Sequence, residues 1–166
     1  MRNPFSGQDS YVSFSHTRFI VFWSKNPAPF IPSLPMLKEG GIGCNVQFTL
    51  NDYEAERLEP NVPPLQQRIE TFRRLVDVLG AGAVVWRFDP LILTDRISID
   101  TLLEKTARIV NALAGYTEEL VFSFADIESY KKVSRNLRQS GINYREWDED
   151  SMRDFALRLS DMNRDN

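Results

Sequence analysis

Apolar residues are concentrated in four short runs, and the segments between the runs carry apolar residues at every third or fourth position. Short apolar runs bounded by glycine, proline or charged residues are typical of strands. The pattern therefore predicts strands near residues 19–24, 46–51, 83–88 and 119–124. The run at 83–88 is nearly continuously apolar, which favours a strand buried on both faces, as in a parallel sheet.

The segments between the runs predict amphipathic helices. The strongest stripe extends from Leu65 to Leu79 and stops before Gly80, a residue type that favours a helix C-terminus. A second stripe begins after Ser98, the expected N-cap, and ends at Gly115. Further helices are expected near 34–38 and 130–139 and after the acidic turn 148–150.

This order of elements predicts an α/β fold with a parallel four-stranded sheet in a single domain covering residues 1–166. Four βα units are half of a (β/α)₈ barrel, so we expect a partial, TIM-barrel-like sheet. An open four-stranded sheet that is complete in itself is the alternative. Residues 1–17 are polar and serine-rich and are expected to form a loop or an arm over an open sheet edge.

Composition narrows the classes of function. The formal net charge of −3 gives no electrostatic case for nucleic-acid binding through the bulk surface. Segment 130–139 is strongly basic, and a solvated helix face is the simpler interpretation, with nucleic-acid contact as the alternative. No apolar stretch approaches the roughly 20 residues that span a bilayer, and no signal peptide is recognisable, so a cytoplasmic setting without membrane contact is expected.

The chain has one cysteine, Cys44, and one histidine, His16. One residue of each kind cannot form an intrachain disulfide or a cysteine–histidine metal cluster, so no metal site is expected. Cys44 precedes a strand and is expected to be a small buried thiol, and His16 is expected to lie at the surface.

Arg87 and Asp89 end the central apolar run. Side chains alternate along a strand, so these two point the same way. In α/β proteins with parallel sheets, ligands bind at the carboxyl ends of the strands. Polar residues follow each expected strand, namely Ser24, Lys25 and Asn26, then Thr49 and Asn51, then Arg87 and Asp89, then Ser123 and Asp126.

These strand ends are our candidate ligand-binding site. Lys25 and Arg87 would hold a small anionic ligand, with Asp89 orienting Arg87 and Asn51 lining the pocket. Asp89 and Asp126 would alternatively bind ribose hydroxyls. A purely structural ion-pair network is the other interpretation.

Two further patterns concern the sheet surface. Gln47, Thr49 and Asn51 share one face of their strand, and in an open sheet that face would be wet. In a barrel the same face would point into the lumen. Trp23 and Trp86 lie at equivalent points of two strands, and core packing is the expected role of both.

Several segments resemble an uncharacterised bacterial family related to spore photoproduct lyase and other DNA-repair, photolyase-like radical-SAM proteins. The matching segments are Arg2–Phe5, Val21–Pro27, Gln47–Asn51, Leu58–Pro64, Trp86–Pro90 and Gly115–Thr117, with Ser123, Phe124 and Asp126. The resemblance implies an additional N-terminal segment, a C-terminal cysteine cluster holding an iron–sulfur centre, and S-adenosylmethionine in longer members. One cysteine cannot supply such a cluster, so no cofactor is expected in this chain.

Two hypotheses for function follow. The first is a partial (β/α)-barrel domain that binds a small anionic ligand, as part of a radical-SAM-like protein. The second is a non-catalytic binding or assembly module that forms homo-oligomers through its open sheet edges.

Overall fold

The structure, a computed structural model, describes residues 7, 13 and 15–164. Its strands are β1 (Phe19–Ser24), β2 (Gly43–Thr49), β3 (Val84–Leu91), β4 (Leu93–Thr94), β5 (Leu120–Phe124) and β6 (Tyr144–Arg145). Its helices are α1 (Leu34–Glu39), α2 (Leu65–Leu79), α3 (Ile99–Leu113), α4 (Lys131–Gln139) and α5 (Glu149–Arg164), with a 3₁₀ helix, η1 (Ala28–Ser33), before α1.

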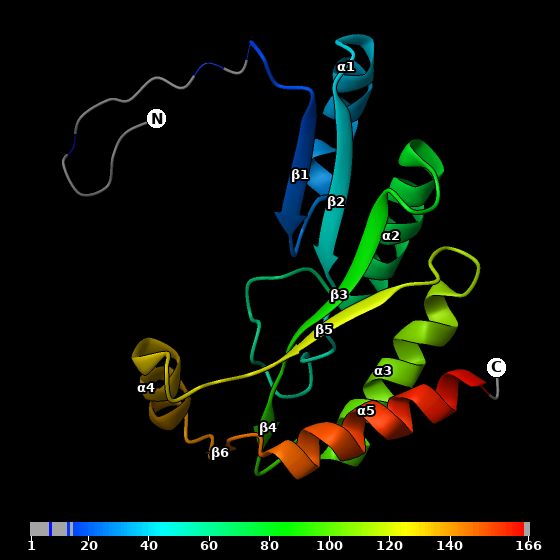
Figure 1. Ribbon diagram of the computed structural model, residues 1–166. Coiled ribbons are helices and arrows are strands. Elements are labelled where there is room, and N and C mark those ends of the chain that lie inside the picture. The colour runs from blue at the N-terminus through cyan, green and yellow to red at the C-terminus, as the bar shows by residue number, and fades with distance from the viewer. Residues whose placement is uncertain (1–6, 8–12, 14, 165–166) are drawn as a thin grey trace.

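The main sheet has the order β1-β2-β3-β5, and all neighbouring strands are parallel (Figure 1). Each strand lies beside the next long strand along the chain, with a helical segment in between. This is the arrangement of successive βα units in a barrel wall. The α/β class and the parallel sheet are therefore confirmed, and the sheet is consistent with a partial (β/α) barrel.

One face of the sheet carries the hydrophobic core. Side chains at even-numbered positions, such as Phe48 and Phe122, point towards α2, α3 and α5. The rings of Phe48 and Phe72 stack at 5.9 Å, and those of Phe122 and Phe155 meet edge to face at 5.7 Å. The apolar stripes of the helices thus cover this face, as their periodicity predicts.

The opposite face is open at β1. Phe19, Val21 and Trp23 point away from the helices, and 59%, 60% and 64% of their surfaces are exposed. The expectation that Trp23 packs in the core is wrong, whereas Trp86 is buried as expected. Trp86 occupies an even position that faces the helices, and Trp23 occupies an odd position on the edge strand of the sheet.

Other expectations are either confirmed or need smaller corrections. β2 begins and ends earlier than the expected 46–51. Ser98 caps α3 as predicted, because its hydroxyl oxygen accepts a hydrogen bond from the Thr101 amide at 3.1 Å. His16 is exposed, as expected. Cys44 is half-buried, not fully buried as expected, and this burial raises the pKa of its thiol. The expected arm over the sheet edge falls mostly on residues outside the described part of the chain.

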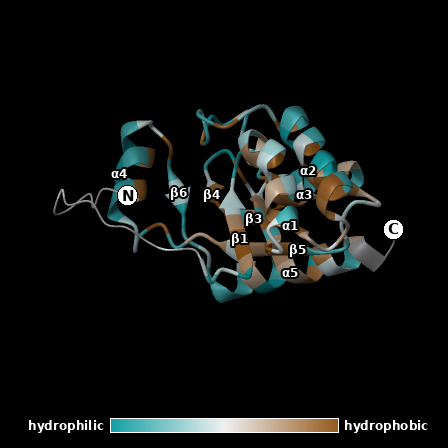
Figure 2. Cartoon of the chain, turned by 90° about the horizontal axis from the view of Figure 1, so that it is seen from above, coloured by the Kyte–Doolittle hydropathy of each residue, from teal (hydrophilic) through white to brown (hydrophobic). Residues whose placement is uncertain are grey.

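The short antiparallel pair β4–β6 was not predicted from the sequence. It returns the chain from α4 to the segment after β3, where the Asp95 amide donates to the Asn143 carbonyl at 2.8 Å. Helix α4 lies apart from α2, α3 and α5 in both views of the chain (Figures 1 and 2). Residues at the end of β5 and on α4 line a common cavity.

Candidate ligand-binding site

Arg87 is held in place on the open face of β3. Its Nε and Nη2 donate to Asp89 Oδ2 at 3.3 and 3.1 Å, and its Nη1 donates to Gln47 Oε1 at 3.2 Å. The guanidinium carbon lies 4.5 Å from the ring centroid of Trp23. Stacking on an aromatic ring and hydrogen bonds to a carboxylate both hold the guanidinium in one orientation.

Asp89 connects the ends of three strands. Its Oδ1 accepts a hydrogen bond from the Ser123 hydroxyl on β5. Its backbone amide donates to Asn51 Oδ1 at 2.9 Å, and its carbonyl accepts from Asn51 Nδ2 at 3.2 Å. The side chain of Asn51, which follows the end of β2, therefore bonds the backbone of β3 just beyond the last paired residues of the two strands.

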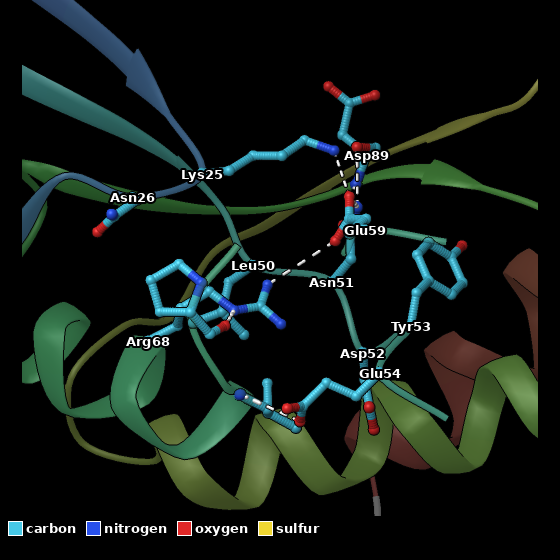
Figure 3. Close-up of polar contacts among 12 residues, drawn as sticks. Lys25, Asn26, Leu50, Asn51, Asp52, Tyr53, Glu54, Glu59, Arg68 and Asp89 are labelled. Carbon is cyan, nitrogen blue, oxygen red and sulfur yellow. Dashed lines mark hydrogen bonds and ion pairs between the residues drawn. The ribbon is translucent and has the colours of Figure 1, made fainter. Parts of the chain in front are cut away.

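Glu59 joins this network from the proline-rich segment before α2. Its Oε1 accepts from the Lys25 ammonium and from Asn51 Nδ2, the latter at 3.0 Å. Its Oε2 lies 3.9 Å from Nη1 of Arg68 (Figure 3). Glu59 and Arg68 were not among the residues predicted from the sequence.

Arg68 is a buried cation. Its Nε donates to the Pro63 carbonyl at 2.8 Å. Burial lowers the pKa of its guanidinium, and the negative charge of Glu59 opposes that effect most strongly. Arg68 Nη1 and Glu59 Oε2 are buried, and neither has a hydrogen-bond partner among the described residues.

Tyr53 fixes the segment that follows β3. Its hydroxyl donates to the Pro90 carbonyl at 2.8 Å and accepts from the Ile92 amide at 3.0 Å. Burial raises the pKa of this phenol far above its ordinary value, so it stays neutral and keeps its donor. The backbone next to Asp89 is thus held from the core side.

A cavity of about 520 Å³ opens beside Asp89. Its polar lining includes Ser123 and Asp126, and Tyr130 contributes to its wall. The Asp126 carboxylate accepts from the Ser129 hydroxyl at 2.6 Å and from the Ser129 amide at 3.2 Å. The charged groups that line this cavity are therefore carboxylates, and none of Lys25, Arg68 and Arg87 is part of its lining.

A model of a known protein family matches residues 1–166, the whole chain. The chain belongs to this family, described as a domain of unknown function (DUF1848). No curated protein and no solved structure matches it. Membership in DUF1848 names no activity, so the chemistry of this domain has to be argued from its geometry.

The DUF1848 domain brings five of the predicted residues into one network. These are Lys25, Asn51, Arg87, Asp89 and Ser123.

The remaining predicted residues lie at its margins. Thr49 is buried beneath Trp23, whose indole Nε1 donates to the Thr49 hydroxyl at 3.1 Å. Asp126 shares the cavity with Asp89, but Asn26 is exposed and points away from the network (Figure 3). The Ser24 hydroxyl accepts from the Asn26 amide at 3.0 Å and so stabilises the turn after β1.

Two expectations about this region are corrected. The face of Gln47, Thr49 and Asn51 is not wet throughout, because Thr49 and Asn51 are buried. Trp23 covers Thr49, and Asn51 forms hydrogen bonds with Asp89 and Glu59. The lining of the cavity beside Asp89 also lacks Lys25 and Asn51, which bond Glu59 instead.

Within residues 7, 13 and 15–164, no group of three or more histidine, cysteine, aspartate or glutamate side chains is arranged to hold a metal ion. None of the helices in the described chain is long and apolar enough to cross a membrane.

Proposed function

We propose that this DUF1848 domain binds a small anionic ligand at the carboxyl ends of β1, β2, β3 and β5. The observation that supports this most directly is the state of Arg87. A guanidinium has five N–H donors, and three of those in Arg87 are used by described residues. The other two remain on a rigid group that still reaches the surface, with 17% of its side-chain surface exposed.

The charges around Arg87 favour an anion. The network contains three cations (Lys25, Arg68 and Arg87) and two carboxylates (Glu59 and Asp89). The carboxylates orient the cations without cancelling their charge. A phosphate or carboxylate group placed at Arg87 would complete the balance, and guanidinium suits such groups because it binds them with two parallel hydrogen bonds.

The cavity on the other side of Asp89 suggests what else the ligand carries. Asp89, Ser123 and Asp126 offer hydroxyl and carboxylate oxygens, which accept hydrogen bonds from ligand hydroxyls. We therefore favour a ligand with one anionic group and a hydroxyl-bearing body, such as a sugar phosphate or a nucleoside derivative.

The relation to spore photoproduct lyase and radical-SAM proteins is part of the same proposal. The segment Trp86–Pro90, which carries some of that resemblance, is the segment that places Arg87 and Asp89. S-adenosylmethionine is not an anion overall, but its carboxylate and ribose hydroxyls are the two kinds of group that the proposed site would bind. An iron–sulfur centre would need cysteines that this chain does not contain.

An assembly module is the second candidate function. Exposed Phe19, Val21 and Trp23 form an apolar row on an edge strand, which is a typical position for pairing with another chain. We propose a second copy of this chain as the partner, because β1 offers it both the apolar row and a strand edge that pairs with no other strand of the described residues.

Thermal unfolding in increasing concentrations of phosphate, sulfate, AMP and S-adenosylmethionine tests the ligand site. At least one of these four compounds should raise the unfolding temperature of the wild type, and Arg87→Gln should remove that response. Arg158→Gln is the matched control, since Arg158 pairs with Asp100 and Asp154 on the surface of α3 and α5. Equal responses in all three proteins would refute the proposal.

A further inference from the structure

A second cavity, of about 600 Å³, lies under α4. The segment after β2 and the loop between β4 and α3 form its other walls. Its size is typical of small-molecule sites. It shares Ile92 and Val133 with the cavity beside Asp89 and none of the residues of the strand-end network, so the two cavities are neighbours with different chemistry.

The charged lining of this cavity is basic. Arg57 and Arg96 are exposed at its edge, and neither guanidinium has a hydrogen bond or ion pair with any residue that the structure describes. Glu56 also lines the cavity, but its carboxylate is engaged by the Lys105 ammonium at 3.1 Å. The positive charge of the two arginines is therefore available to a ligand.

Arg57 also has an unusual backbone. Its φ is 55°, and no other non-glycine residue in the described part of the chain has a positive φ. This left-handed conformation is readily adopted by glycine and disfavoured for a long side chain. An arginine at such a position, pointing at no protein partner, is better explained by what its side chain binds than by the turn that its backbone makes.

The remaining lining is apolar with two polar groups. Leu58, Ile92, Leu137 and Ile142 supply the apolar wall. Asn136 on α4 and Ser140, which caps its C-terminus, also line the cavity, and their side chains make no hydrogen bond to the described residues. An apolar wall with a few unmatched polar groups is the usual composition of a small-molecule site.

We infer that the cavity under α4 binds an organic anion in which one carboxylate, sulfonate or phosphate is attached to an apolar body. Arg57 and Arg96 hold the anionic group, and the apolar wall of α4 and the segment after β2 covers the body. This site goes beyond the strand-end function proposed above and does not depend on it, because it uses none of Lys25, Arg87 or Asp89.

The test uses 8-anilinonaphthalene-1-sulfonate, which combines a sulfonate with aromatic rings and fluoresces when it is bound. Fluorescence titration of the full chain should saturate at one strong site. The double variant Arg57→Gly/Arg96→Gln should bind the dye at least tenfold more weakly, since two charge-assisted contacts are lost. Glycine relaxes the backbone at residue 57, so this variant should unfold at a temperature no lower than that of Arg57→Gln/Arg96→Gln.

The matched control is Lys131→Gln/Lys132→Gln. This control also removes two positive charges, but from residues of α4 that do not line the cavity. It should bind the dye within twofold of the wild type. Equal weakening in both double variants would overturn the inference, because the dye would then respond to general charge. Weakening by Trp23→Ser alone would also overturn it, by placing the dye on the exposed face of β1, and loss in Arg87→Gln would do so by placing the dye at the strand ends.

Discussion

Arg87 and Asp89 lie on the same side of β3, and the guanidinium donates two hydrogen bonds to a single carboxylate oxygen, at 3.3 and 3.1 Å. The second oxygen of Asp89 is occupied by the Ser123 hydroxyl. The carboxylate thus fixes the orientation of Arg87 and also competes with any other anion for it. Both consequences are measurable.

Removing the Asp89 carboxylate should destabilise the fold. Asp89→Ala leaves a mostly buried guanidinium without its counterion, so we expect a loss of about 3 kcal/mol in the free energy of unfolding. Urea denaturation measures this loss. Asp154→Ala, which breaks an exposed ion pair on α5, is the control and should cost under about 1 kcal/mol. An Asp89→Ala protein as stable as the control would show that the pair is not structural.

Glu59 and Arg68 should respond unequally to substitution. Glu59→Leu leaves buried Arg68 without its nearest carboxylate, and the expected cost is about 3–5 kcal/mol. Arg68→Met keeps most of the buried volume, and Glu59 retains its bonds to Lys25 and Asn51, so the expected cost is about 1 kcal/mol or less. Chemical denaturation of both variants shows which of them loses more free energy of unfolding. The opposite order would mean that Arg68 stabilises the site by its charge.

Acid should weaken the start of α5. Asp148 Oδ1 accepts from the Ser151 amide at 2.8 Å, and hydrogen bonding to Ser151 lowers the pKa of this carboxyl. A lowered folded-state pKa means that the stabilisation is complete above the unfolded value, near pH 4, and is lost as the pH falls through the folded value. Unfolding temperatures measured from pH 6 down to pH 2 should therefore fall more steeply for the wild type than for Asp148→Asn, whose cap does not titrate. Parallel curves would contradict this assignment.

The exposed row on β1 should promote self-association if the assembly hypothesis is correct. Light scattering at increasing protein concentration should then detect a dimer, and Val21→Ser/Trp23→Ser should shift the equilibrium to monomer. The control Val78→Ser removes a similarly exposed apolar side chain from α2. A strict monomer at all concentrations would exclude this partner.

Hydrophobic periodicity was enough to predict the parallel sheet and to place Arg87 and Asp89 on one side of β3. It could not place Trp23, because a two-residue alternation does not say which face of an edge strand the helices cover. Glu59 was missed because it reaches the network from a loop, and loop paths leave no periodic signal. Arg68 had a visible signal, since it lies three residues after Leu65 and four before Phe72, within the apolar stripe of α2.

The most direct test of the proposed function is the affinity of the strand-end site for inorganic phosphate, measured by calorimetry on the wild type and on Asp89→Asn. The asparagine keeps an acceptor for Ser123 but removes the charge that competes for Arg87. If Arg87 is the anion receptor, phosphate should bind Asp89→Asn about tenfold more tightly than the wild type, and adding Arg87→Gln should abolish the gain. An affinity that is unchanged or weaker in Asp89→Asn would contradict the account, because Arg87 and Asp89 would then form a structural pair only.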